Sequence, residues 1–257
     1  MLTLRTSGVN RWAPSDGGVR LDVPDVEDGE LEVKANGSTA TAQVSEGWAV
    51  LAPSGLMELC PIGISTLWFG DVSAIVERVG CRYCTRADIE AHGELQQDDF
   101  DDTVKYPDEQ VAAAIQVAEE AIEAGTGRSF CERSVVATLP ASPVVWLPVN
   151  DATAIEAEAE GSIPAILLSG SQASVVQPGR YRIAYGAHLP ASLREACIRL
   201  AASKLRPRTR AEDARGSSVD GVYTSYTLAT GEDGSWTGLP SVDAAIAENA
   251  ARRVMVL

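Results

Sequence analysis

The first 80 residues alternate apolar and polar positions, and this period of two predicts β-strands. Turn-forming residues such as Asp28-Gly29 separate the alternating runs. One pair, Asn36-Gly37, is the typical signal of a tight hairpin. The clearest runs are residues 19–23, 31–35, 39–44 and 48–51. We therefore expect a small sandwich or barrel-like β module at the N-terminus.

From residue 85 onward the apolar period becomes that of a helix. Thr85-Arg86-Ala87-Asp88 resembles a capping box with Asp in place of Glu, which predicts a short helix ending at Gly93. Pro107 opens a longer helix that ends at Gly125. Its apolar stripe is Val111, Ile115, Ala118 and Ile122. Its other face carries Glu119, Glu120 and Glu123.

Residues 131–187 return to short alternating runs and predict a second β region. Pro190 then opens another helix, which ends at Arg206-Pro207. The apolar stripe of this helix is Leu193, Cys197, Leu200 and Ala201. A final helix begins after Pro240, with a stripe of Val242, Ile246 and Ala250 and with Arg252 and Arg253 in its last turn.

The connection between these two helices, residues 207–240, is long and polar, with one β-like run at 221–228. Connections of this length are uncommon unless they are functional, disordered or held by a partner. Ordering so polar a segment needs a neighbouring surface to offset the lost backbone entropy. The sequence therefore gives a first hint of an assembly.

The charge is unevenly distributed. The chain has 36 acidic and 21 basic residues, a net charge of −15, and residues 86–125 contain 12 acidic and 2 basic side chains. A negative surface repels phosphate, so nucleic-acid binding through counterion release is not expected. Two interpretations stay open: an ordinary solvated acidic face, or a surface that lies near DNA without adhering to it.

Candidate chemistry is sparse. Cys81 and Cys84 form a CxxC spacing, but a structural zinc site needs about four ligands, and the other candidates, Cys60 and His92, are single residues. The pair could serve zinc binding or redox chemistry, or be two incidental small residues. Hydrolase, metalloprotease, P-loop and dinucleotide-binding motifs are absent from the sequence. We expect no catalytic residues, no metal and no cofactor.

Apolar runs in the sequence are shorter than the roughly 20 residues that cross a bilayer. The first residues, Met1 to Thr6, lack the pattern of a secretory signal. We expect a soluble protein that is made without export and has no membrane partner.

Several segments resemble the head–tail connector (adaptor) proteins of tailed bacteriophages. The first ones lie at 83–90, 106–111 and 118–130, and those of the second half open the helices at 189–196 and 238–246. Together they cover about 120 of the 257 residues, and their order and spacing agree with the family.

The resemblance implies a small helical bundle of the connector type with an antiparallel β excursion. Together with the N-terminal β-rich domain that the alternating pattern predicts, the expected fold class is α+β. The corresponding division is a β module at 1–80, a helical core at 81–130 and 188–257, and a β insertion at 131–187. The β module and the size of the insertion depart from the family pattern.

The implied function is structural. Such subunits form a ring, typically of twelve copies, that docks on the portal, extends the DNA channel and links the capsid to a stopper or tail protein. DNA passes through without specific binding. The implied location is the neck of the virion, assembled in the host cytoplasm. Two alternatives remain: a zinc- or redox-dependent module using Cys81 and Cys84, and β modules that bind capsid decoration or a host glycan.

Two sets of residues are candidates for contacts in such a ring. Residues 194–215 carry seven basic and three acidic side chains, opposite in sign to residues 86–125. We hypothesise that the two segments set register between subunits or toward the portal, with the interface residues Arg206, Arg208, Arg210, Glu119, Glu120 and Glu123. The alternative is that these charges balance within one subunit.

The resemblance assigns portal docking to the last helix, through Val242, Ile246, Ala250, Arg252 and Arg253. The alternative is that this helix closes its own helical bundle.

Overall fold

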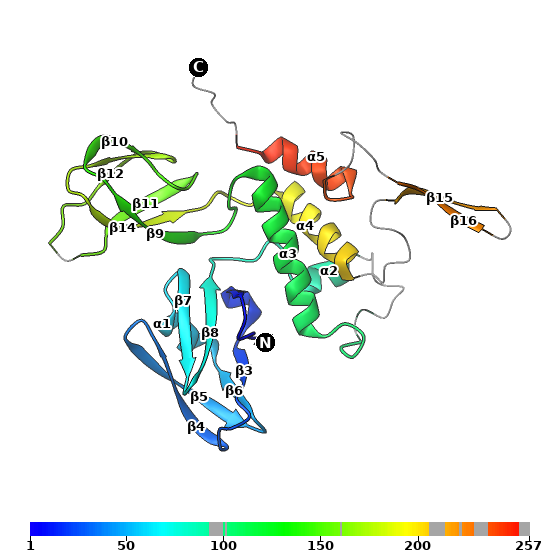
Figure 1. The fold of residues 1–257 in the computed structure, drawn as a ribbon, viewed down its shortest axis with the longest axis horizontal. Coiled ribbons are helices and arrows are strands. Elements are labelled where there is room, and N and C mark those ends of the chain that lie inside the picture. Colours follow the sequence, from blue (N-terminus) through cyan, green and yellow to red (C-terminus); the bar gives the residue numbers. More distant parts are fainter. Residues whose placement is uncertain are drawn as a thin grey trace. The chain divides into compact units, whose positions relative to one another are not determined.

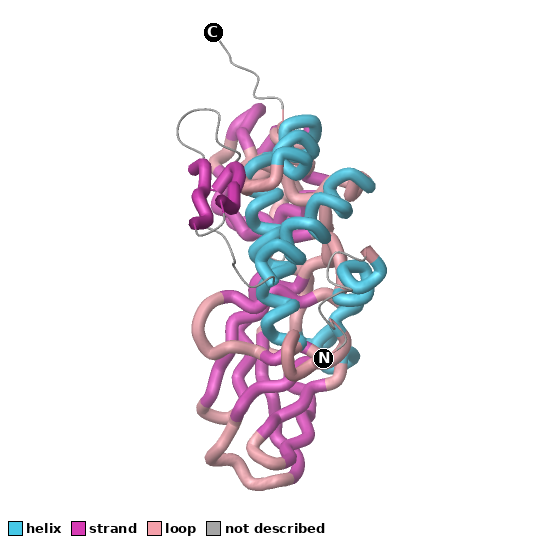
Figure 2. Tube along the Cα trace, turned by 90° about the vertical axis from the view of Figure 1, so that its right-hand side faces the viewer, coloured by secondary structure: helices cyan, strands magenta, loops and turns pink. Residues whose placement is uncertain are grey.

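The computed structural model describes residues 1–92, 100, 102–159, 161–205, 236–251 and the backbone of two further strands, 214–220 and 223–228. Two compact units make up the fold: Met1–Tyr83 with Gly127–Leu189, and Cys84–Thr126 with Pro190–Leu257. Figure 1 labels the elements, and Figure 2 colours them by type. The three-part division drawn from the sequence stays a prediction.

The N-terminal part folds as an eight-stranded, nearly closed sheet with the strand order β1-β3-β6-β5-β4-β7-β8-β2. Its pairs are antiparallel except β1 with β3 and β2 with β8, which are parallel. A short helix, α1 (Pro53–Leu59), packs on β5. The strands are β1 (Leu2–Thr3), β2 (Val9–Trp12), β3 (Val19–Asp22), β4 (Gly29–Ala35), β5 (Ser38–Ser45), β6 (Trp48–Leu51), β7 (Gly63–Phe69) and β8 (Val72–Arg78).

The alternation of residues along the strands places every second side chain inside the barrel. In β7 every second side chain is buried, including Leu67 and Phe69, as period-two patterning requires. Asn36 and Gly37 form the predicted tight turn between β4 and β5, and both have positive φ, at 51° and 81°. The Asn36 side chain donates to the Leu59 carbonyl and to Ser65 Oγ. This hydrogen bonding ties the hairpin to α1 and β7.

A buried side chain fastens the edge strand β2 at the seam of the barrel, where β1 and β2 are the two ends of the strand order. Asn10 on β2 is 3% exposed, and its Oδ1 accepts the Arg5 N–H at 2.9 Å. Its Nδ2 donates to the carbonyls of Arg5 and Ile75 at 2.9 and 3.0 Å. One amide therefore bonds the backbone of the segment that follows β1 and that of β8, the strand paired with β2.

The second β region consists of two three-stranded sheets, ordered β10-β13-β12 and β11-β14-β9. Buried side chains from both sheets, among them Val175, Tyr181 and Ile183, form a separate core. The strands are β9 (Arg133–Leu139), β10 (Ser142–Trp146), β11 (Ala152–Ala157), β12 (Ile166–Ser169), β13 (Gln172–Val175) and β14 (Gly179–Tyr185). Strands β15 (Ala214–Asp220) and β16 (Tyr223–Leu228) form a further antiparallel pair.

The helices of the second unit are α2 (Arg86–Ala91), α3 (Asp108–Thr126), α4 (Ala191–Leu205) and α5 (Pro240–Asn249). The predicted capping box is present: Thr85 and Asp88 bond each other's backbone and side chain at the start of α2. The predicted apolar stripes of α3 and α4 are buried. Helix α3 packs along α4, and α5 packs on both (Figure 1).

The expectation of a small helical bundle is wrong. Strands predominate over helices, and the largest element is the barrel (Figure 2). Helical stripes show where helices occur, but they carry no information on how much of the chain pairs into sheets. Strand β11 has the sequence Ala-Thr-Ala-Ile-Glu-Ala, which is poor in strand-forming residues, and pairing with β14 overrides that weak preference.

The seam supports a first prediction. Replacing Asn10 by Ala removes three part-buried hydrogen bonds to the backbone of Arg5 and Ile75, so the free energy of unfolding of the barrel should fall by about 2–4 kcal/mol. Urea unfolding measures the change. Asn150→Ala is the control, because Asn150 makes one exposed hydrogen bond to the Gly127 carbonyl and should cost under about 1 kcal/mol. Equal stability of the two variants would contradict the role of the seam.

Candidate interaction surfaces

The end of β8 and the start of β9 are joined at a tight junction. A disulfide links Cys81 to Cys131, and the Gly80 N–H donates to the Glu132 carbonyl at 2.9 Å. A Cβ on Gly80 would lie 2.9 Å from the Glu132 Cβ, so only glycine allows this approach. The Tyr83 hydroxyl accepts the Phe130 N–H at 2.8 Å. These bonds fasten two segments about 50 residues apart in sequence.

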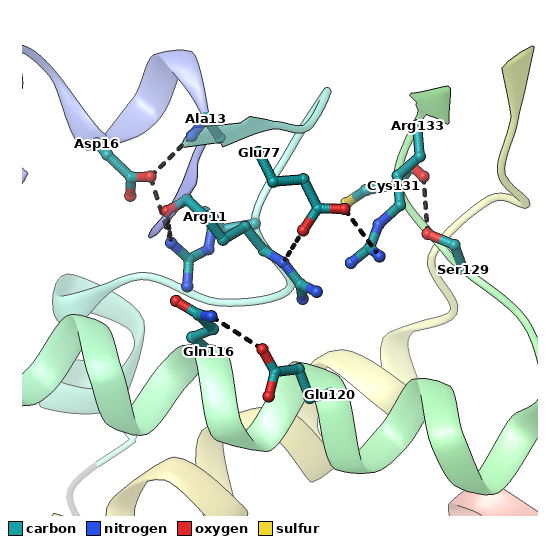
Figure 3. A network of polar contacts seen from close by, with 10 residues as sticks. Arg11, Ala13, Asp16, Glu77, Gln116, Glu120, Ser129, Cys131 and Arg133 are labelled. Atoms are coloured by element: carbon teal, nitrogen blue, oxygen red, sulfur yellow. Dashed lines mark hydrogen bonds and ion pairs between the residues drawn. The ribbon is translucent and has the colours of Figure 1, made fainter. Parts of the chain in front are cut away.

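A carboxylate between two arginines extends the junction (Figure 3). Glu77 on β8 accepts from Arg11 Nε on β2 at 3.1 Å and pairs with Arg133 Nη1 on β9 at 3.2 Å. The three side chains are 5–16% exposed. Ser134 Oγ also donates to the Ile62 carbonyl. Little-exposed charges are stable only when paired, so this cluster requires its two β regions to meet in one register.

The CxxC cysteines do not act as a pair. Cys81 is in the disulfide, whereas Cys84 Sγ lies 3.3 Å from Cys197 Sγ in the second unit. Burial raises the pKa of the Cys60 thiol to about 11 and keeps it protonated at neutral pH. Within the described part of the chain, no three His, Cys, Asp or Glu side chains are grouped as a metal site. The zinc or redox alternative therefore loses the pairing on which it was based.

The predicted docking face of the last helix is packed inside its own unit. Val242 and Ile246 are buried, and a Cβ on Gly125 of α3 would lie 2.6 Å from the Ile246 side chain. These two residues therefore match the alternative stated for the last helix, in which it packs on the other helices of its own subunit. Ala250 caps α5 and is half-buried. Arg252 and Arg253 lie outside the described residues.

A shallow groove of about 290 Å³ runs between α4 and α5. Its polar side chains are largely paired with each other: Arg199 contacts Glu195 at 2.5 Å and Ser241 at 3.2 Å. The groove is therefore a packed seam of the helical unit.

The charged residues predicted for the subunit interface differ in their exposure. Glu119 was expected on the open face of its helix, but it is 1% exposed. Glu120 is exposed and accepts from Gln116 at 2.8 Å (Figure 3), and Glu123 is half-buried. Arg206, Arg208 and Arg210 lie outside the described residues. Their interface role stays a prediction.

Within the second unit, several basic side chains balance acidic ones. Arg194 pairs with Asp88, and Arg86 pairs with Asp108, both at 2.8 Å. Burial opposes ionisation of Asp88, but hydrogen bonds from Thr85 and the charge of Arg194 outweigh it, so the pKa of Asp88 is lowered. For these residues, the alternative of charge balance inside one subunit applies.

Sequence patterning did not reveal two exposed apolar surfaces. The insertion patch comprises Val144 and Trp146 on β10 with Ile166 and Leu168 on β12, each at least half exposed. The barrel patch comprises Ile64 and Trp68 on β7 with Ile75 on β8. In both, alternation turns every second residue outward, and the outward residue is apolar where solvent would favour a polar one. That departure from alternation is the sequence signal that could have found them.

Comparison with known proteins finds similarity among solved structures, at low identity. No protein-family model and no curated protein matches the chain. Among solved structures, a chain from the "Neck of empty GTA particle computed with C6 symmetry" is similar, with a TM-score of 0.42 and 18% identity over 68% of this chain and 93% of that one. Because this likeness is low, the function of this chain is argued from its own residues. Among the described residues, no helix has the length and apolar character to cross a membrane.

The lowered pKa of Asp88 gives a pH-dependent prediction. A carboxylate whose pKa is lower in the folded state stabilises the fold above its unfolded pKa of about 3.9, and the contribution is lost as the pH falls through the folded pKa. Asp88→Asn should lower the free energy of unfolding by about 1 kcal/mol at pH 7 and by much less at pH 3. Urea unfolding at both pH values measures it, with the exposed Asp108→Asn as control. A difference that persists at pH 3 would argue against this origin.

The disulfide gives a second prediction at this site. The Cys81–Cys131 bond closes a loop of 50 residues. Its loss should therefore destabilise the first unit by up to about 4 kcal/mol. Reductant should lower the urea midpoint of the wild type and leave that of Cys131→Ser unchanged. Thiol titration of the oxidised, unfolded protein should find the three free cysteines Cys60, Cys84 and Cys197. Five reactive thiols would show that the bond is absent.

Proposed function

We propose that this chain is a structural subunit of the neck of a tailed, phage-like particle. The observation that carries the proposal is the order of helix-opening motifs at Thr85, Pro107, Pro190 and Pro240, which resembles the head–tail connector family. The helices that follow them, α2 to α5, pack together although a β insertion separates α3 from α4 in the sequence.

In this role several copies form a ring between the portal and a stopper or tail protein, and DNA passes through its centre. The net charge of −15 suits a conduit, because a basic wall would bind the phosphates of passing DNA and retard it. Exposed acids on α3, such as Glu109 and Glu120, belong to the most acidic part of the chain. Catalysis has no part in this function.

Portal contact is assigned to the end of the chain. Since Val242 and Ile246 are held in the helical unit, the residues available beyond α5 are those from Ala250 onward, with Arg252 and Arg253. Arg206, Arg208 and Arg210 together with Glu120 and Glu123 are proposed to set register between neighbours. Such charges fix orientation more than they add affinity.

The test is the position of the chain in particles. Particles assembled with the tagged wild-type chain should carry it in several copies at the neck, as seen by electron microscopy and by mass spectrometry of purified particles. Particles without the chain should have filled heads that lack tails. A chain found in the tail fibres, or missing from finished particles, would refute the neck assignment.

A matched truncation tests the portal contact separately. A chain ending at Ala251 keeps α5 and the hydrogen bond from the Ala251 N–H to the Thr126 carbonyl, so its thermal unfolding should equal that of the wild type. Removing residues 252–257 should abolish co-sedimentation with the portal protein. Undiminished co-sedimentation would exclude the last residues as the contact.

A further inference from the structure

The insertion patch is a charge-free surface on a strongly acidic protein. Residues 134–150 and 161–179, which supply β10, β12 and β13, contain no Asp, Glu, Lys or Arg. The inward face of this sheet, with Val145, Ala173 and Val175, already fills a core. The outward face presents apolar side chains on the two outer strands β10 and β12, to either side of Gln172 and Ser174 of the central strand β13.

The apolar area of this surface is large. Val144, Trp146, Ile166 and Leu168 are 50–65% exposed, and two similar residues flank them at the ends of the sheet, Ile163 and Val176. At roughly half exposure each, these side chains present on the order of 500 Å² of apolar surface, near the upper end for the largest patch on a monomer. Trp146 is 65% exposed, and tryptophan is the side chain most enriched at the energetic centre of interfaces.

The barrel offers a complementary hollow. An open pocket of about 530 Å³ lies beside the Asn36-Gly37 turn, and Ile64 and Trp68 of the barrel patch line it. Pockets of this size hold drug-sized ligands, so an indole ring can enter. Lys34, whose partner across the strand pair is Trp68, also lines the pocket. The lining of the hollow thus combines apolar side chains with polar ones.

We infer that the insertion patch of one copy docks on the barrel patch of the next, with Trp146 seated in the hollow beside Trp68. This inference rests on the proposed ring, because a ring needs two different faces of one subunit that fit each other. The distribution of charge supports a second copy of the chain as the partner that binds the barrel patch. Two copies with a net charge of −15 repel each other, so an apolar contact between them is favoured on a surface without acids, and the charge-free sheet of the insertion is such a surface.

The experiment uses two variants, one altered in the insertion patch and the other in the barrel patch. Trp146→Glu places a charge on the insertion patch, and Trp68→Glu places one on the barrel patch; both side chains are exposed, so each variant should fold with wild-type thermal stability. Sedimentation velocity over a range of concentrations should show association of the wild type. Each variant alone should associate roughly a hundredfold more weakly, because it removes an indole ring from the contact and places there a charge that must lose water on association.

Mixing the variants in equal amounts gives the decisive measurement. The Trp146→Glu chain keeps its barrel patch and the Trp68→Glu chain keeps its insertion patch, so the mixture should form a dimer that cannot extend. Ala154→Glu on β11 and Ser45→Glu on β5 add the same charge at exposed positions outside both patches and should associate like the wild type. If Trp146→Glu unfolds, Ile166→Glu on the same face takes its place.

Three results would overturn the inference: a monomeric wild type at every concentration, variants that associate like the wild type, or a mixture that stays monomeric. Failure of this inference is distinct from failure of the proposed function. A chain that occupies the neck while both variants still assemble refutes only the docking of these patches. A chain that associates through the patches but is missing from particles refutes the neck role.

Discussion

The junction between β8 and β9 is the constraint on which the first unit depends. Gly80 and Glu132 approach so closely that no side chain fits between them, and the Cys81–Cys131 disulfide fixes the two strands at this point. Glu77 then needs Arg11 from one β region and Arg133 from the other, because a lone, little-exposed carboxylate would be costly. Backbone contact, covalent bond and ion pair all require the same register, so the two β regions meet in one way.

This constraint explains what remains on the surface. The carboxylate of Glu77 at the junction and the amide of Asn10 at the seam of the barrel are bonded internally, and the thiol of Cys60 is buried and protonated. What the folded chain presents outward is a set of acids on the helices and two apolar patches on the strands. Acids repel other acids and DNA alike, whereas apolar patches gain free energy when covered. A protein with this surface is suited to assembly and to proximity without adhesion.

Local patterns predicted the elements well where one signal was strong. Asn36-Gly37 gave the hairpin, Thr85 with Asp88 gave the capping box, and the stripe from Val111 to Ile122 gave the buried face of α3. These features depend on residues within a few positions of each other. The overall fold class was wrong, because the barrel depends on non-local pairing such as that of β2 with β8, whose paired residues Val9 and Ile75 lie 66 positions apart in the sequence.

The sequence by itself determined the alternation of β and helical segments, the concentration of acids at residues 86–125, and the absence of familiar catalytic motifs. Tertiary structure alone decided which cysteines are partners, that Val242 and Ile246 face inward, and that Trp68 and Trp146 face outward. The physical reason is the same in each case. A periodic pattern says that a side chain has an apolar face, but only the packing of distant segments decides whether the protein itself covers that face.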